Sequence, residues 1–292
     1  MKKIILVICF FTVIGLTGCN SNETFAIKEI NLEMVKCPAG SFMMGSSEEE
    51  LGRPEVNEQG KIISEILHLV TITKPFYIGK YEITQSQYSA LMGRNPSEFV
   101  DPNNPVERIS WKEAKEFINK LNLKYLNQVP QGYKFDFPTE AQWEYACRAG
   151  TSTAFNNDKN LSTNEYDKTC PNLDEVAWYR ENSNKTTHNV GLKKPNAWGI
   201  YDMHGNVAEW CRDCLYAYTN KDSIDPYRDY NNDTPDFHMF RGGASVSRGE
   251  ILNINEKSGC RSAKRFFPIK QFQDSGLREN CIGLRVALVP TN

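Results

Sequence analysis

Three helix-start signals, each followed by a short apolar stretch, limit this chain to a few modest helices. The signals are the capping-box pairs Thr84 with Gln87, Ser110 with Glu113, and Thr139 with Gln142. In such a pair the first side chain accepts a hydrogen bond from the third helical N–H, and the second reaches back to the cap N–H. The helices predicted from them reach Leu91, Leu121 and Ala146. With 19 Gly and 14 Pro, the rest of the chain indicates long ordered loops rather than a helical bundle.

Strand signals are short and scattered, and they make the expected fold class α+β. Residues 34–37 and 41–45 flank Pro38-Ala39-Gly40 and predict a hairpin. Residues 69–73 alternate between apolar and polar side chains, and residues 76–83 and 282–289 are also typical of strands. The pattern alone does not predict how these strands pair.

Charge and composition exclude several function classes. The 34 basic and 36 acidic residues give a net charge of −2, so we expect no nucleic-acid partner. Hydrophobic residues make up 40% of the chain, which excludes intrinsic disorder of the whole chain. No low-complexity linker divides the chain, and we expect one domain over residues 28–290.

The N-terminus has the features of a bacterial lipoprotein signal peptide. Lys2 and Lys3 precede an apolar run, and Leu16-Thr17-Gly18-Cys19 matches a lipobox. The interpretation is that residues 1–18 are removed, that Cys19 is lipidated, and that residues 19–27 form a tether. The alternative is an ordinary secretory peptide with a chance cysteine. Either case predicts an extracytoplasmic location, and lipidation predicts membrane attachment in the cell envelope.

A series of motifs resembles the formylglycine-generating enzyme (sulfatase-modifying factor) family, block by block and in the family's order. The blocks are Pro38–Ser46, Tyr77–Gln85, Asn104–Trp111, Phe137–Ala146, Asn196–Val207, Glu209–Trp210, Arg241–Gly243, Cys260–Ala263 and Gly283–Val286. The resemblance implies a C-type-lectin-like α+β fold with little regular secondary structure and bound calcium. It also implies an oxidase that converts a sulfatase cysteine to formylglycine with O2 and a copper(I) ion held by two cysteines.

The copper cysteines are missing from the matching positions. Ser247 stands where the family has its first copper cysteine, and the following segment, residues 248–259, contains no cysteine. The family's active-site Asn is replaced by Cys281, and a family Trp by Ala208. A serine hydroxyl is a hard donor that stays protonated, so it does not replace a thiolate for copper(I). We therefore expect no copper and no catalytic residue, unless Cys260 and Cys281 serve as improvised ligands.

The segment that matches the family's calcium site departs less from the family pattern than the copper site does. The resemblance places the ligands of one calcium site on Asp202, Gly205, Val207 and Glu209, as two carboxylates and two backbone carbonyls. Hard oxygen donors at this close spacing suit calcium. The alternative interpretation of the segment is a solvated turn.

Other cysteines leave several possibilities open. Seven cysteines follow Cys19, and an extracytoplasmic location permits disulfides, although their pairing does not follow from the sequence. The Cys211-x-x-Cys214 spacing is also that of a redox or zinc pair, but no second pair accompanies it.

Three functional hypotheses follow. The first is a non-catalytic envelope lipoprotein that binds a protein or glycan or acts in envelope assembly. The second is a copper- and O2-dependent oxidase of a sulfatase cysteine. The third is a different chemistry in the same cleft, which Arg261, Arg265 and Arg285 would line.

Overall fold

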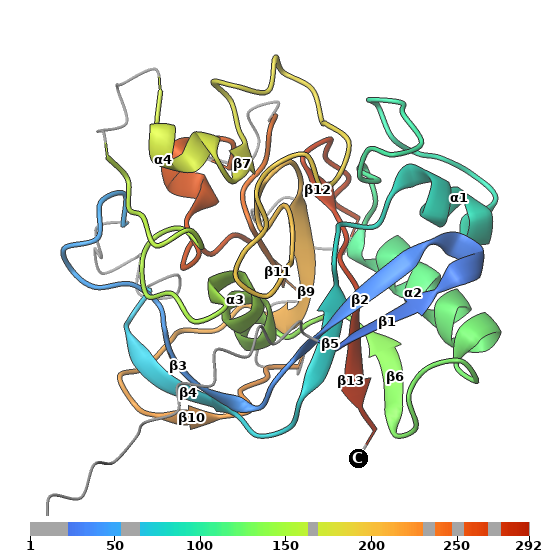
Figure 1. Cartoon of the computed structure of the whole chain (residues 1–292), viewed down its shortest axis with the longest axis horizontal. Coiled ribbons are helices and arrows are strands. Elements are labelled where there is room, and N and C mark those ends of the chain that lie inside the picture. Colours follow the sequence, from blue (N-terminus) through green and yellow to red (C-terminus); the bar gives the residue numbers. More distant parts are fainter. Residues whose placement is uncertain are drawn as a thin grey trace, which may run out of the picture.

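The computed structural model describes residues 23–53, 65–162, 169–229, 237–246, 254–267 and 276–291. Short helices and short strands are joined by long loops, which confirms the α+β class (Figure 1). The largest sheet has five antiparallel strands in the order β1-β2-β5-β13-β6. These strands are Thr24–Ile27, Leu32–Cys37, Phe76–Gly79, Ala287–Pro290 and Tyr133–Asp136.

The three predicted main helices are confirmed, each with its capping box. They are α1 (Gln85–Met92), α2 (Trp111–Tyr125) and α3 (Glu140–Arg148). The first two lie beside the five-stranded sheet (Figure 1). One face of α2, from Ala114 to Tyr125, is buried in the core that the sheet and these helices share.

The second half of the chain forms smaller sheets around α3. Strands β11 (His238–Arg241) and β12 (Ile282–Gly283) pair with opposite edges of β9 (Ala208–Cys214). A two-stranded parallel pair joins β7 (Ala177–Trp178) to β8 (His204–Gly205). The remaining elements are β3 (Gly40–Met44), β4 (His68–Ile72), β10 (Ser223–Ile224), α4 (Pro171–Asp174) and the 3-10 turns Lys28–Ile30 and Lys257–Cys260.

Some strand expectations are wrong. The predicted hairpin around Pro38 does not form, because β2 pairs with β1 and β5 while β3 pairs with β4 in a different sheet. The predicted strand over residues 76–83 ends at Gly79. The C-terminal run over residues 282–289 is split between two sheets as β12 and β13. Strand β4 is confirmed over nearly the expected residues. No helix in the described ranges is long and apolar enough to cross a membrane.

Candidate ligand pocket

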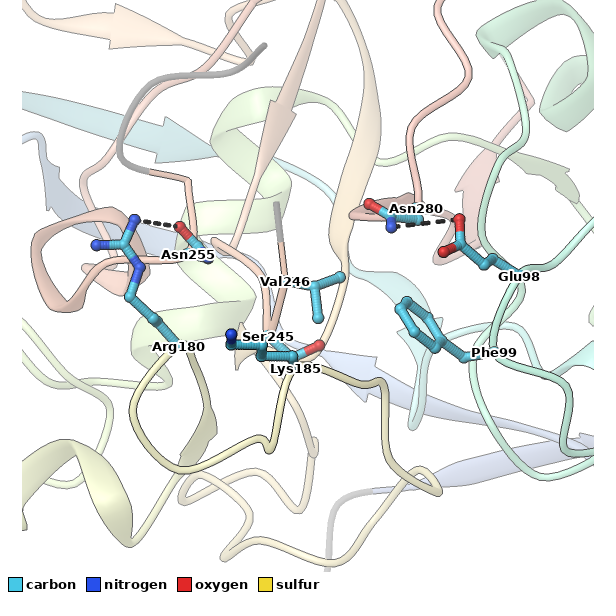
Figure 2. A pocket seen from close by; sticks show the side chains of 8 residues that line it. All are labelled: Glu98, Phe99, Arg180, Lys185, Ser245, Val246, Asn255 and Asn280. Carbon is cyan, nitrogen blue, oxygen red and sulfur yellow. Dashed lines mark hydrogen bonds between the residues drawn. The ribbon is translucent and has the colours of Figure 1, made fainter. Parts of the chain in front are cut away.

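A pocket of about 440 Å³ lies where five loop segments converge. Its wall consists of Glu98 and Phe99 after α1, Arg180 and Lys185 after β7, Ser245 and Val246 after β11, Asn255 before the last 3-10 turn, and Asn280 before β12. The volume lies within the usual range for small-ligand sites. Figure 2 shows Arg180 and Asn255 on one side, Glu98 and Phe99 on the other, and Val246 between them.

The side of the pocket near Glu98 presents acceptor oxygens. Asn280 donates through Nδ2 to Glu98 Oε2 at 3.4 Å (Figure 2). Because a carboxylate only accepts, this contact assigns the amide nitrogen toward Glu98. The other end of the amide, Oδ1 of Asn280, is buried and has no hydrogen-bond donor among the residues that the structure describes.

The buried acid Glu107 binds the backbone of the loop that forms this side of the pocket. Oε1 of Glu107 accepts hydrogen bonds from the backbone N–H of Phe99, at 2.9 Å, and of Glu98. The side chain is fully buried, and this burial raises the pKa of Glu107 to about 7. Two backbone N–H groups therefore tie the pocket loop to one carboxyl group.

The opposite side carries positive charge. Arg180 donates to Asn255 Oδ1 and to Glu256 Oε1, each at 3.2 Å. Lys185 is exposed beside it, and the structure records no ion pair for its ammonium group in the described part of the chain. The pocket therefore has a cationic side, an acceptor side, and the apolar side chains of Phe99 and Val246 between them.

A profile of the sulfatase-modifying factor enzyme 1-like domain family matches residues 22–289. The chain belongs to this family. Chaperone protein LppX of Paenibacillus barcinonensis is 30% identical over 257 residues, which cover 72% of this chain and 81% of that protein. The formylglycine-generating enzyme of Streptomyces coelicolor is 26% identical over 161 residues, 52% of this chain and 45% of the enzyme. The match thus spans less than half of that enzyme.

Solved structures confirm the family fold over most of the chain. Treponema denticola variable protein 1 superposes with a TM-score of 0.70 at 26% identity, covering 92% of this chain and 99% of that one. PvdO from Pseudomonas aeruginosa gives a TM-score of 0.69 at 25% identity, covering 92% and 98%. The predicted C-type-lectin-like α+β fold of this family is therefore confirmed.

Two of the predicted site residues, Ser247 and Cys19, lie outside the described residues. The chain enters the Ser247 segment directly from Val246, which lines the pocket. The described lining residues include no cysteine. In its described part, the pocket wall thus presents none of the soft sulfur donors that a copper(I) centre of this family would need.

Cys260 and Cys281 do not form an improvised copper pair in this arrangement. Cys281 packs in the core of the five-stranded sheet, whereas Cys260 packs with Cys170 in a separate cluster. Burial raises the pKa of both thiols, which disfavours the thiolate that binds a metal.

Every described cysteine is buried, and none of them forms a disulfide. Cys211 and Cys214 lie on one strand, β9. The pairing of β9 with β11 is irregular between these two residues, and their sulfur atoms have different neighbours. Cys211 packs in a hydrophobic cluster with Met239, whereas Sγ of Cys214 lies 3.8 Å from Nδ1 of His238. This placement does not suit the redox or zinc pair that their spacing could indicate.

The predicted calcium segment forms a sharp turn, with positive φ at Asp202, Gly205 and Asn206. Both carboxylate oxygens of Glu209 are occupied: Oε1 accepts from Arg285 at 2.7 Å and Oε2 accepts from Trp143 at 2.6 Å. Oδ2 of Asp202 accepts from the N–H of Gly191 at 2.6 Å.

These contacts do not fit a calcium site in which Glu209 is a ligand, unless the guanidinium of Arg285 moves away. No group of three or more His, Cys, Asp or Glu side chains in the described segments is arranged to hold a metal. Calcium at Asp202, Gly205, Val207 and Glu209 stays a prediction.

Arg261, Arg265 and Arg285 do not line the pocket, contrary to the hypothesis of a cleft lined by arginines. Each is buried and paired with an acid: Arg261 with Glu65, Arg265 with Glu140, and Arg285 with Glu209. Their role is structural, since each guanidinium neutralises a carboxylate that burial would otherwise make costly.

The residues that build the pocket were not singled out from the sequence. Asn280 directly precedes Cys281, which occupies the position of the family's active-site Asn, and it lines the pocket while Cys281 is buried. This position next to Cys281 was the one signal in the sequence that could have pointed to Asn280. Glu98 and Lys185 lie in loops whose sequence carries no motif.

Proposed function

We propose that this protein is a non-catalytic family member that acts in the cell envelope as a binding or assembly module, attached to the membrane through lipid on Cys19. Its pocket would take a short segment of another polypeptide. The observation that carries the proposal is a pocket whose described lining residues are charged, polar and apolar and include no thiol.

Two further points support a binding role. The relative with 30% identity is named a chaperone protein, and the family fold is retained without the matching copper cysteines. The alternative function is copper- and O2-dependent oxidation of a sulfatase cysteine, and its only support is that the chain belongs to this family.

A copper(I) titration of the purified mature protein tests the proposal against that alternative. We expect no stoichiometric copper(I) binding and no aldehyde on a peptide carrying the sulfatase cysteine motif. The formylglycine-generating enzyme of Streptomyces coelicolor, assayed in parallel, is the positive control. Tight one-to-one copper binding together with aldehyde formation would establish the oxidase instead. Cell fractionation of wild type and Cys19→Ser tests the anchor, which requires the variant to leave the membrane fraction.

A further inference from the structure

The distribution of hydrogen-bonding groups in the pocket specifies the kind of polypeptide segment that it can hold. This inference rests on the proposed polypeptide-binding function. The pocket wall contains a buried acceptor oxygen that has no donor among the described residues.

Oδ1 of Asn280 is that acceptor. The residue is 4% exposed and its amide is held by the contact from Nδ2 to Glu98. Leaving a buried oxygen unpaired carries a free-energy cost, because the oxygen has lost its hydrogen bonds to water. A ligand that donates a hydrogen bond at this point would remove that cost. The neighbouring Glu98 carboxylate, whose charge Arg108 partly offsets at 3.8 Å, favours a donor that is positively charged.

Lys185 imposes the opposite requirement on the other side. Its ammonium group is exposed at the pocket with no recorded ion pair in the described part of the chain. The neighbouring Arg180 contributes a second positive charge, which Glu256 partly offsets at 3.2 Å. A ligand group that lies here should accept hydrogen bonds and carry negative charge.

Between these two sides the pocket is apolar. Val246 is almost buried and Phe99 packs against the core of the five-stranded sheet. An aliphatic side chain placed between the charged groups would bury apolar surface there, which is favourable.

We propose that the pocket recognises a polypeptide segment in which a basic side chain and an acidic side chain flank an apolar one. The basic group lies at Asn280 and Glu98, and the acidic group lies at Lys185 and Arg180. The volume of about 440 Å³ restricts the segment to a few residues.

Labelled peptides with capped ends test this inference on the purified mature protein by fluorescence anisotropy. The set carries a lysine and a glutamate separated by one, two or three residues, including a leucine. Matched peptides replace the lysine, the glutamate or both by glutamine. We expect each replacement to weaken binding about two- to fivefold, as for partly exposed charge pairs.

A charge reversal gives the sharper result. Lys185→Glu should weaken binding of the lysine–glutamate peptide about five- to tenfold, and it should improve binding of a peptide whose glutamate is replaced by lysine. Lys112→Glu, an exposed position on α2, is the matched control and should change neither. Asn280→Ala should remove the preference for lysine over glutamine.

The outcomes separate the two proposals. The charge pattern is wrong if peptides with both charges replaced by glutamine bind wild type as tightly as the lysine–glutamate peptides. It is also wrong if Lys185→Glu has the same preference among the peptides as wild type. Either result would leave the proposal of a polypeptide-binding pocket intact. If no peptide of the set binds, the proposed polypeptide-binding function itself is wrong. Unfolding curves of each variant confirm that the fold is retained.

Discussion

Buried arginine–glutamate pairs connect segments of this loop-rich chain that are far apart in sequence. Arg285 is an example: it contacts both oxygens of Glu209 and donates to the carbonyl oxygens of Gly79 and Tyr201 at 2.8 Å each. A buried pair of this kind contributes little relative to an apolar replacement, but removing one partner leaves an uncompensated charge. The fold therefore depends on both members being present.

Glu209→Gln tests this dependence. We expect a loss of about 3 kcal/mol in the free energy of unfolding, because the buried guanidinium of Arg285 loses the carboxylate that it hydrogen-bonds, and the nearby acids Glu82 and Asp202 offset this loss only in part. Glu116→Gln is the control, since Glu116 forms an exposed pair with Lys120 at 3.4 Å and should cost about 0.5 kcal/mol or less. Urea unfolding measures both. Equal effects in the two variants would contradict the structural role of Glu209.

The same variant bears on the calcium prediction. If Glu209 is a calcium ligand, the unfolding temperature of wild type must be higher in calcium than in a chelator, and Glu209→Gln must remove the difference. If calcium does not change the unfolding temperature of wild type, Glu209 is not a calcium ligand, and the cation that it pairs with is the guanidinium of Arg285.

At the level of residues, the sequence allowed an assignment only where a position could be matched to a family motif. Ser247 and Cys281 were identified this way as departures from the family pattern. The pocket residues Glu98, Lys185 and Asn280 come from three separate loops. Their meeting depends on how those loops pack, and local sequence carries no period or spacing that reports it.

At the level of elements, local signals and long-range pairing had different outcomes. The helices follow from capping boxes, whose hydrogen bonds join residues three apart. The hairpin around Pro38 was wrong because the partner of β3 is β4, about 25 residues further along the chain. Strand partners are chosen by which faces must be buried, and that depends on the whole core.

The β7–β8 pair offers a test of one close backbone approach. Gly205 has φ +76, and a Cβ atom there would lie 2.0 Å from the carbonyl oxygen of Trp178 on the neighbouring strand. Gly199 has φ +81, and a Cβ there would meet nothing within 4 Å. Both substitutions by alanine carry the backbone strain of positive φ, but only the first also forces two strands apart.

We expect Gly199→Ala to destabilise the protein by about 1 kcal/mol, the cost of left-handed backbone for alanine. Gly205→Ala should cost at least about 2 kcal/mol more, because the clash is with rigid backbone. Chemical unfolding of the two variants gives the difference directly. Similar values would show that β7 and β8 separate easily at this point.

At the scale of the whole molecule, buried ionisable groups set how stability depends on pH. Burial raises the pKa of Asp213 to about 7, with a further contribution from the charge of Glu140. The pKa of Glu107 rises to about 7 for the same reason, with a smaller contribution from the charge of Glu98. Burial also lowers the pKa of His204 to about 4. The acids and the histidine act in opposite directions on stability.

The sign follows from proton binding in the folded and unfolded states. An unfolded acid releases its proton near pH 4, whereas folded Glu107 and Asp213 keep theirs until about pH 7, so their stabilisation is lost as pH rises between those values. His204 opposes this, because the unfolded imidazole binds a proton below about pH 6.5 and the folded one does not until about pH 4. Above pH 6.5 only the acids titrate, and stability should fall towards pH 8.

Glu107→Gln and Asp213→Asn should each flatten the fall in unfolding free energy between pH 5 and pH 8 by about 1–3 kcal/mol. Glutamine at position 107 can still accept from the N–H groups of Glu98 and Phe99, so the pocket loop keeps its support while the titration disappears. Asp222→Asn, at an exposed position, is the control and should leave the pH profile unchanged. Urea unfolding at several pH values measures the slopes. If the stability of wild type instead rises between pH 6.5 and pH 8, these two carboxyl groups are ionised in the folded protein. Further contacts must then compensate for their burial.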